Sequence, residues 1–187
     1  HLAPLGGGTG IVVTDASALP TPMGVDPTAA ERAFRIGAND ELQIDVVGFE
    51  ALTARKFRTD ADGGISVPLA GRVNAMGLTP RELEVALTSQ LRAAHVRNPI
   101  VSVNMSEVRS QLITVDGQVK EPGQFPVIGR MSLMQSVARA KGLTETARLD
   151  DVVVFRTVGD QRMVALYNLA AIRRGTYPDP EIFANDI

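Results

Sequence analysis

The chain has 187 residues, which is enough for one domain or for two small ones. Apolar residues make up 44% of it but aromatic residues only 4%, so a core has to be built mainly from Val, Leu, Ile and Ala. The formal net charge of −2 argues against a nucleic-acid-binding protein, because such proteins concentrate basic residues on one surface. Cysteine is absent, which excludes disulfide frameworks, thiolate zinc sites and cysteine nucleophiles.

Residues 1–31 are predicted to be a flexible or extended leader. Glycine and proline are dense there, and no helical or strand period is present. The segment Gly6-Gly-Gly-Thr-Gly lacks the Lys-Ser/Thr of a phosphate-binding loop and precedes no clear helix, so we interpret it as flexible chain. We expect parts of the leader to become ordered by packing on the rest of the protein or on a neighbouring copy.

A first module begins with strands. Apolar and polar residues alternate over residues 42–46, which is typical of a half-buried strand. Residues 56–59 and 64–69 flank the turn sequence that begins at Asp60, and this arrangement predicts a β-hairpin. Residues 72–75 predict another short strand.

The clearest predicted helix of the chain comes next. Thr79 is a suitable N-cap, Pro80 occupies the first helical position, and Glu82 completes a capping box. One apolar stripe lies along the helix and consists of Leu83, Ala86, Leu87 and Leu91. Pro99 then prevents a helix, and the alternation over residues 101–105 predicts a strand.

A second module is predicted to start near Ser110. The buried face of its first strand would be formed by Ile113, Val115 and Val119. Residues 120–123, Lys-Glu-Pro-Gly, predict a type II turn, with residues 124–128 returning as the hairpin partner. Residues 152–156 and 162–167 predict two further strands around a Gly-Asp turn.

Two more helices are predicted in the second module. Ser132 and Gln135 form a second capping box, and Gly142 is a natural C′ residue for that helix. A short third helix is predicted to begin at Asn168 and to end at Gly175.

One short sequence occurs twice. Ala38-Asn-Asp-Glu-Leu recurs as Ala184-Asn-Asp-Ile. Both copies predict a tight turn that leads into a strand, because Asn and Asp tolerate the backbone conformations of turns. The second copy has almost none of the strand that should come after it, so we expect the second module to be truncated at its C-terminal end.

No residue pattern predicts a metal site or a catalytic site. Asp60-Ala-Asp-Gly-Gly resembles part of a calcium loop, but no acidic residue occurs at the required spacing, so we favour a plain turn. His95 has no sequence partners for a metal site or a catalytic triad, and we interpret it as a helix-terminal residue. Asp150 and Asp151 are adjacent on the chain and would point to opposite faces of a strand, whereas glycosidases need two carboxyls that face one another.

Four motifs in this order resemble the polysaccharide biosynthesis/export family. The motifs are Asp60-Ala-Asp-Gly-Gly-Ile-Ser-Val-Pro-Leu-Ala-Gly, Gly77-Leu-Thr-Pro-Arg-Glu-Leu, Arg97-Asn-Pro-Ile-Val-Ser-Val and Val115-Asp-Gly-Gln-Val-Lys-Glu-Pro-Gly. The turn before the first strand departs from the usual Pro-Gly-Asp of the family. The resemblance implies an α+β fold made of two small α/β modules.

The resemblance also implies a domain division. After the leader of residues 1–31, we expect a polysaccharide-export domain over residues 32–108. A β-grasp domain of the soluble-ligand-binding (SLBB) type would then occupy residues 109–187.

By resemblance, the protein is expected to be a non-enzymatic component of a capsular or exopolysaccharide export conduit. It would act as a ring-forming translocation channel or as a channel adaptor, in the periplasm and associated with the outer membrane, with a lipid anchor in the full-length protein as one means of attachment. The expected partners are the polysaccharide, further copies of the chain, an inner-membrane polysaccharide co-polymerase and, as a further option, a separate outer-membrane barrel. No nucleic acid and no cofactor or metal is expected.

A ring that encloses a hydrated polymer needs a polar lumen and heterologous contacts between subunits. Strand edges and the helix face opposite Leu83, Leu87 and Leu91 are plausible subunit contacts. Possible contacts to the polymer or to a subunit are a small basic group and two scattered arginines, namely Arg55, Lys56, Arg58, Arg72 and Arg97. The alternative for these five residues is an ordinary solvated surface.

Two other functions remain open at this point. The protein could be a saccharide-binding module without a conduit role, which a tight stoichiometric sugar ligand on a monomer would favour. It could also be an enzyme that acts on polysaccharide, although the sequence lacks an acid/base pair for that chemistry.

Overall fold

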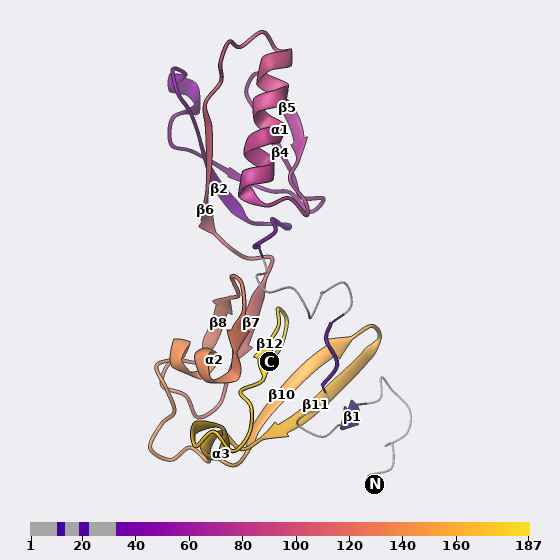
Figure 1. Ribbon diagram of the computed structural model, residues 1–187, viewed down its shortest axis with the longest axis vertical. Coiled ribbons are helices and arrows are strands. Elements are labelled where there is room, and N and C mark those ends of the chain that lie inside the picture. Colours follow the sequence, from indigo (N-terminus) through magenta and orange to yellow (C-terminus); the bar gives the residue numbers. More distant parts are fainter. Residues whose placement is uncertain (1–10, 14–18, 23–32) are drawn as a thin grey trace. The chain divides into compact units, whose positions relative to one another are not determined.

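The computed structural model describes residues 11–13, 19–22 and 33–187. Helices and antiparallel strands are both present, so the predicted α+β class is confirmed. The chain divides into two compact units, which we call the first unit (Ala33–Gln111) and the second unit (Leu112–Ile187 with the described leader residues) (Figure 1). The predicted glycine-rich leader segment at residues 6–10 lies outside the described residues.

The first unit contains a three-stranded antiparallel sheet and a separate hairpin. Strand β2 (Glu41–Val46) is the central strand, and it pairs with β3 (Arg55–Arg58) on one edge and with β6 (Val101–Glu107) on the other. Strands β4 (Gly64–Val67) and β5 (Gly71–Asn74) form the hairpin. Alternate residues of β2 are buried, as the sequence pattern predicted.

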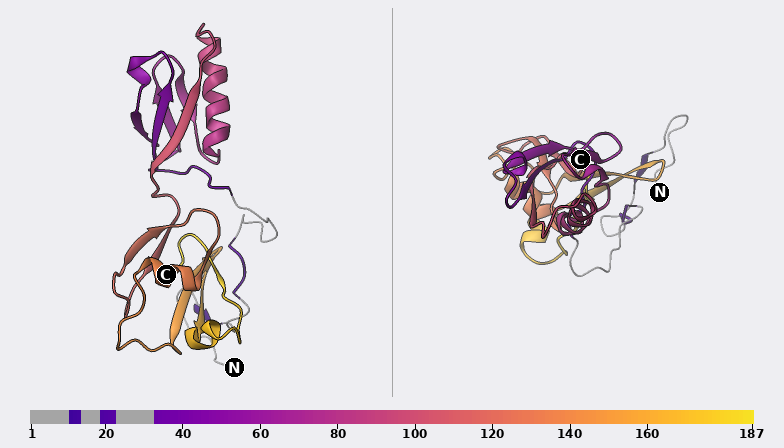
Figure 2. Two further views of the ribbon diagram at one scale, coloured as in Figure 1. Left: turned by 60° about the vertical axis from the view of Figure 1, so that its left-hand side comes forward. Right: turned by 90° about the horizontal axis from the view of Figure 1, so that it is seen from above.

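Helix α1 (Pro80–Ala93) lies along one side of these strands (Figure 2). Its predicted capping box is confirmed, because the Glu82 backbone N–H donates to Thr79 Oγ1 at 3.1 Å and the Thr79 N–H donates to the Glu82 carboxylate at 3.2 Å. The buried stripe of the helix, Leu83, Leu87 and Leu91, packs in one core with apolar residues of β2 and β6. Burying a leucine side chain contributes about 1.5–3 kcal/mol, so this stripe holds the helix on the sheet.

The predicted hairpin between residues 56–59 and 64–69 is wrong. Strand β3 pairs with β2, and β4 pairs with β5, so the two strands that flank the turn belong to different sheets. The turn itself is present, because the Asp60 carboxylate accepts hydrogen bonds from the N–H groups of Asp62 and Gly64, both at 2.9 Å. The turn sequence fits both the predicted pairing of β3 with β4 and the observed pairing of each with another strand. The alternation of apolar and polar residues within a strand does not determine which strand it pairs with.

The second unit is built from short antiparallel pairs. Its described strands are β7 (Leu112–Val115), β8 (Gly123–Pro126), β9 (Met131–Ser132), β10 (Val152–Val158), β11 (Gln161–Tyr167) and β12 (Glu181–Ile182). The pairs are β7 with β8, β9 with β12, and β10 with β11. Leader strand β1 (Ile11–Val13) adds to β11 in parallel.

Two predicted details of the β7–β8 connection are wrong. Gly123 does not have the positive φ that a type II turn requires; it opens β8, and a positive φ of 91° falls on Gly117 instead. Val119 is buried, but it forms an isolated bridge with Leu143 and is not part of β7. The segment between the strands bonds to the end of a helix, since the Glu121 N–H donates to Ala140 O at 2.9 Å.

Helix α2 (Leu133–Arg139) has the predicted Ser132–Gln135 capping box, and α3 (Leu169–Arg173) is capped by Asn168 as predicted. Each of the three described α-helices ends in a Schellman motif. The left-handed C′ residues are His95, Lys141 and Gly175. Gly142 is therefore one position later than predicted: it is C″ of α2, and its N–H donates to Val137 O at 2.9 Å.

The repeated Ala-Asn-Asp sequence forms a turn at both sites. Asn39 and Asn185 have φ values of 61° and 71°, and the aspartates next to them are buried. We call residues 37–40 the Asp40 turn and residues 183–186 the Asp186 turn. The Asp40 turn leads directly into β2.

No described helix combines the length and the apolar composition that crossing a membrane would need; the longest has 14 residues.

Candidate functional site

The basic group predicted from the sequence lies on β3, an edge strand of the first unit, and one of its members is engaged within the protein. Arg58 donates to Glu41 at 3.0 Å, to Glu107 at 2.9 Å and to the Asn39 carbonyl at 2.8 Å. The hydrogen bond to Glu107 raises the pKa of the Arg58 guanidinium, and the same bond, followed by that from Arg109, lowers the pKa of Glu107. Arg58 therefore ties β2, β3 and β6 together.

The other two residues of the group are less engaged. Lys56 lies 3.8 Å from the Glu41 carboxylate, which is a loose and exposed ion pair. Arg55 lies over the Phe57 ring, with 5.4 Å from its guanidinium carbon to the ring centroid. Both cations stay exposed, and successive strand residues project to opposite faces, so they do not form one patch.

Arg72 and Arg97 are separate from this group. The Arg72 guanidinium is paired with Asp60 at 2.8 Å and lies over Gly64, where a Cβ would overlap it. Hydrogen bonding from the Gly64 N–H, and then from Arg72, lowers the pKa of Asp60. Arg97 is exposed in the loop between α1 and β6, and it makes no ion pair with any residue of the described ranges.

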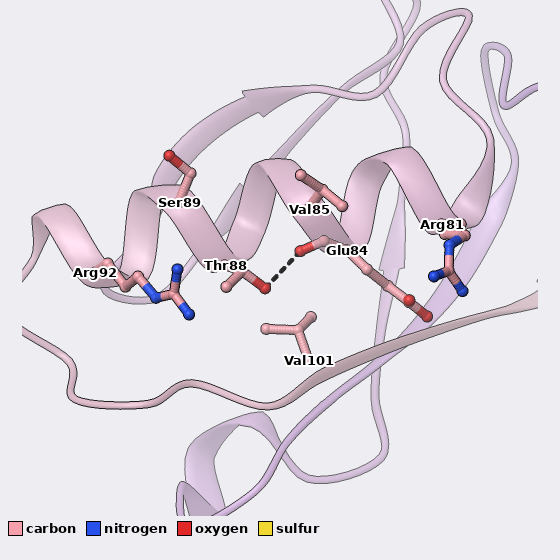
Figure 3. A pocket seen from close by; sticks show the side chains of 7 residues that line it. All are labelled: Arg81, Glu84, Val85, Thr88, Ser89, Arg92 and Val101. Atoms are coloured by element: carbon pink, nitrogen blue, oxygen red, sulfur yellow. Dashed lines mark hydrogen bonds between the residues drawn. The ribbon is translucent and has the colours of Figure 1, made fainter.

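A groove lies between α1 and the start of β6, and its lining residues were not predicted from the sequence. Its volume is about 380 Å³, and its lining residues are Arg81, Glu84, Val85, Thr88, Ser89, Arg92 and Val101. Figure 3 shows Arg81, Glu84, Thr88 and Arg92 projecting from the helix towards the side on which Val101 lies. Half-buried Glu84 and Thr88 place the groove beside the buried leucine stripe, on the flank of α1 next to β6, whereas the sequence had indicated the face opposite the stripe as a possible subunit contact.

Two polar groups in this groove are structural. Glu84 accepts a hydrogen bond from the Val103 backbone N–H at 3.0 Å, so its carboxylate satisfies an edge donor of β6. The Thr88 hydroxyl donates to Glu84 O at 2.7 Å. Arg81 and Arg92, at the two ends of the groove, are not engaged in this way. Within the part of the chain that the structure describes, neither of them forms an ion pair.

The spacing of these residues is a signal that was available in the sequence. Residues 81, 85, 88 and 92 have the i, i+4, i+7, i+11 pattern of one helix face, and both ends of that face are arginine. At a rise of 1.5 Å per residue, the two Cα atoms are about 16 Å apart along the axis. The two exposed arginines therefore place positive charge at two separated points of one helix face, with the Glu84 carboxylate between them.

The residues considered for catalysis lie in structural positions. His95 is the exposed left-handed C′ residue of α1. Asp150 pairs with Arg148 at 3.3 Å, and that hydrogen bond lowers the pKa of Asp150. Among the described residues, no three His, Asp or Glu side chains gather in a way that could hold a metal ion.

Two family models match the chain, one on each unit. The model described as polysaccharide biosynthesis/export protein matches residues 28–106, and the SLBB domain model matches residues 112–166. The first match falls on the unit that contains α1 and the β3–β2–β6 sheet, and the second falls on the unit that contains β7 to β11.

Curated relatives are similar over parts of the chain. The EPS I polysaccharide export outer membrane protein EpsA of Ralstonia solanacearum is 38% identical over 85 residues, which cover 45% of this chain and 22% of EpsA. The exopolysaccharide production protein ExoF of Rhizobium meliloti is 23% identical over 121 residues, 59% of this chain and 28% of ExoF. The polysialic acid transport protein KpsD of Escherichia coli is 24% identical over 150 residues, 75% of this chain and 27% of KpsD.

The matched segments thus span about a quarter of the length of these relatives. Motif order, fold and both family matches agree with one another. The chain thus contains a segment that matches the polysaccharide biosynthesis/export family, residues 28–106, followed by a segment that matches the SLBB domain, residues 112–166.

Proposed function

We propose that the protein is a non-enzymatic component of a polysaccharide export apparatus in the cell envelope, located in the periplasm and associated with the outer membrane. The observation that carries this proposal is the succession of an export-family domain and an SLBB domain on two consecutive structural units. The names of the relatives support it, because they describe export, production or transport of polysaccharides, and one of them describes an outer membrane protein.

Within that apparatus, the protein is a ring-forming channel or a channel adaptor. A hydrated polymer needs a wide polar passage, and small domains can enclose one only by cyclic assembly through heterologous contacts. An inner-membrane polysaccharide co-polymerase would deliver the polymer, and a separate outer-membrane barrel would complete the path if the protein does not span the membrane itself.

The groove beside α1 is the polymer contact that we favour. Arg81 and Arg92 have no ion pair within the described residues, whereas Arg58 and Arg72 are occupied by acidic neighbours. Of the five residues predicted from the sequence, Arg55, Lys56 and Arg97 remain candidates for weak polymer or subunit contacts. Weak contacts suit a conduit, because tight binding would hold the polymer in place.

The overall proposal is tested by deleting the gene and measuring polysaccharide outside the cell, with the full-length gene returned as the control. Loss of external polymer, with the biosynthetic genes intact and recovery on complementation, is the expected result. Normal external polymer together with a tight, stoichiometric saccharide ligand would favour the saccharide-binding module instead.

The groove is tested separately by returning the full-length gene with R81Q and R92Q combined. We expect several-fold less external polymer, with protein level and assembly size unchanged. The matched control is R139Q with R173Q, which neutralises two exposed arginines in the last turns of α2 and α3. Unchanged export by the groove variant would contradict a polymer contact, and a change of assembly size would assign the groove to a subunit interface.

A further inference from the structure

Three connections of the first unit lie at one end of it. Because β2 pairs antiparallel with both β3 and β6, residues 47–54 after β2 and residues 94–100 before β6 are at the same end of the sheet (Figure 1). The open end of the β4–β5 hairpin lies beside Ile36, which precedes β2 and whose carbonyl accepts from the Gly77 N–H at 2.9 Å. The closed end of the hairpin, residues 68–70, therefore points towards the other two connections. We call these three connections the loop end of the first unit.

Each connection of the loop end exposes one bulky apolar side chain. Val47, Leu69 and Ile100 are 67%, 57% and 63% exposed. Val47 and Ile100 are neighbours, because the Val47 N–H donates to Ile100 O at 3.1 Å and directly paired residues of antiparallel strands project to the same side. Exposed apolar residues that are scattered singly need no explanation, whereas three at one end of a small unit indicate an interaction surface.

Leu69 is unfavourable in its position for a second reason, the conformation of its backbone. Its φ is 70°, in the left-handed region, and it follows Pro68 in the turn between β4 and β5. Proline followed by a positive φ is the pattern of a type II turn, whose second central position normally takes Gly or Asn. A leucine in this conformation brings its Cβ too close to the following carbonyl oxygen. The turn thus keeps a bulky apolar side chain both strained and exposed, which is typical of residues that contact a partner.

The charged residues in and next to these connections carry an excess of positive charge. They are three arginines and one exposed glutamate, namely Arg55, Arg92, Arg97 and Glu50. Asp45 comes shortly before the first connection, and its carboxylate is engaged by the Ala54 N–H. None of the three arginines forms an ion pair with a residue of the described ranges, so their charges are available to a partner.

A lipid bilayer fits this combination better than a partner of fixed shape. The three apolar side chains come from separate connections and do not line the groove beside α1, so they are projecting points and not the wall of a socket. A fluid bilayer accepts such points without shape complementarity, because apolar side chains enter the boundary between headgroups and acyl chains. Cations beside them are attracted to anionic headgroups, by about 1 kcal/mol for each Lys or Arg near the surface.

We propose that the loop end of the first unit is a contact surface for bilayers that contain anionic lipids. Leu69 and the Val47–Ile100 pair enter the boundary between headgroups and acyl chains, and Arg55 and Arg97 bind lipid phosphates beside them. One copy binds weakly, because only three apolar side chains are inserted, and several copies that act together bind more strongly. The inference rests on the surface of the first unit and does not depend on the proposed export role.

The test is flotation of the 187-residue chain with vesicles of phosphatidylglycerol and phosphatidylcholine in equal parts, compared with vesicles of phosphatidylcholine alone. We expect several-fold more protein to float with the anionic vesicles, and the difference to shrink at high salt. The double variant L69S/I100S should lose most of that binding. The matched control is I128S/L166S, which removes one Ile and one Leu of similar exposure, 59% and 54%, from the second unit and should bind like wild type.

Leu69→Gly separates the contact from folding, because Gly adopts a positive φ without strain. This variant should bind anionic vesicles several-fold less than wild type while its melting temperature is equal or higher. The proposal is overturned if the chain does not float with anionic vesicles, if both vesicle types bind equally, or if L69S/I100S binds no less than I128S/L166S. It is also overturned if L69S/I100S changes the assembly size and leaves vesicle binding unchanged, since the loop end would then be a subunit contact.

Discussion

The Asp40 turn and the Asp186 turn hold a buried carboxylate in the same backbone geometry, and they satisfy it in different ways. Among the described residues, Asp40 accepts only from uncharged donors: the N–H groups of Gly37, Arg109 and Ser110 at 2.9, 2.7 and 2.8 Å, and the Ser110 hydroxyl at 2.6 Å. Asp186 accepts from the Arg156 guanidinium, at 2.8 Å from Nη2 and 3.0 Å from Nε. Arg156 and Asp186 are 4% and 2% exposed.

The difference shows two roles for one short sequence. The Asp40 carboxylate joins the beginning of the first unit to its end, because its donors lie 69 and 70 residues later. The Arg156–Asp186 pair ties the end of the second unit to β10, and Arg156 also donates to the carbonyls of Glu181 and Pro20. Loss of the Asp40 carboxylate would leave uncharged N–H groups without a hydrogen-bond acceptor. Loss of either partner of the Arg156–Asp186 pair would leave a buried charge without its counter-charge, which costs more free energy of unfolding.

The largest effect should come from breaking the ion pair. Asp186→Ala leaves the Arg156 guanidinium buried without its counter-charge, which is expected to cost about 3–5 kcal/mol of unfolding free energy. Urea denaturation followed by circular dichroism measures it. The double variant R156M/D186N removes both charges and should recover part of the loss; if the double variant is less stable than Asp186→Ala, the charge-pair explanation is wrong.

A smaller effect is expected at the other turn. Asp40→Ala leaves three backbone N–H groups of the first unit without their acceptor, at a cost of about 2–4 kcal/mol. Asp40→Asn retains one acceptor oxygen and should lose less, which urea denaturation of both variants measures. Equal losses for the two Asp40 variants would mean that the uncharged donors are satisfied in some other way.

The close approach of the two ends of the first unit can be tested through Gly37. A Cβ at this position would overlap the Ser110 Cβ and lie 2.8 Å from its Oγ, so Gly37→Ala should cost about 1–3 kcal/mol through overpacking. Gly123→Ala is the matched control, since nothing lies within 4 Å of its Cβ position, and a change within about 0.5 kcal/mol is expected. Similar thermal stabilities of the two variants would contradict the tight contact.

The smallest effect concerns an exposed aspartate and depends on pH. Asp60 has a lowered pKa in the folded protein, so its contribution to stability is present above its unfolded pKa of about 3.9 and is lost as pH falls through the lower folded value. Between pH 5 and about 2, wild type should therefore lose slightly more stability than Asp60→Asn. Unfolding curves at several pH values measure the difference, and parallel losses would show that Asp60 is not linked to folding.

Local sequence signals predicted the local structure well. The capping boxes at Thr79 and Ser132 and the turns at both Ala-Asn-Asp sites are found as the sequence indicated, because their donors and acceptors lie within three residues of one another. The β3–β4 hairpin failed, since strand partners are chosen by the whole sheet. The partners of Asp40 and Asp186 lie 30 to 70 residues away, and no local pattern identifies them.

The candidate site shows the same limit. The basic residues on β3 were visible as a cluster, but the acidic partners of Arg58 come from two other strands of the fold. Arg81 and Arg92 carry a readable helical spacing, yet only the folded unit shows that Glu84 between them is committed to β6. The sequence identifies charged residues as candidate contacts, but only the folded structure shows which of them are already paired within the protein.

The most direct test of the export role is to measure polysaccharide in the periplasm and in the medium of a strain that lacks the gene. The account predicts that polymer disappears from the medium while the biosynthetic genes remain expressed, and that the full-length gene restores it. Unchanged polymer in the medium of the deletion strain would contradict the account.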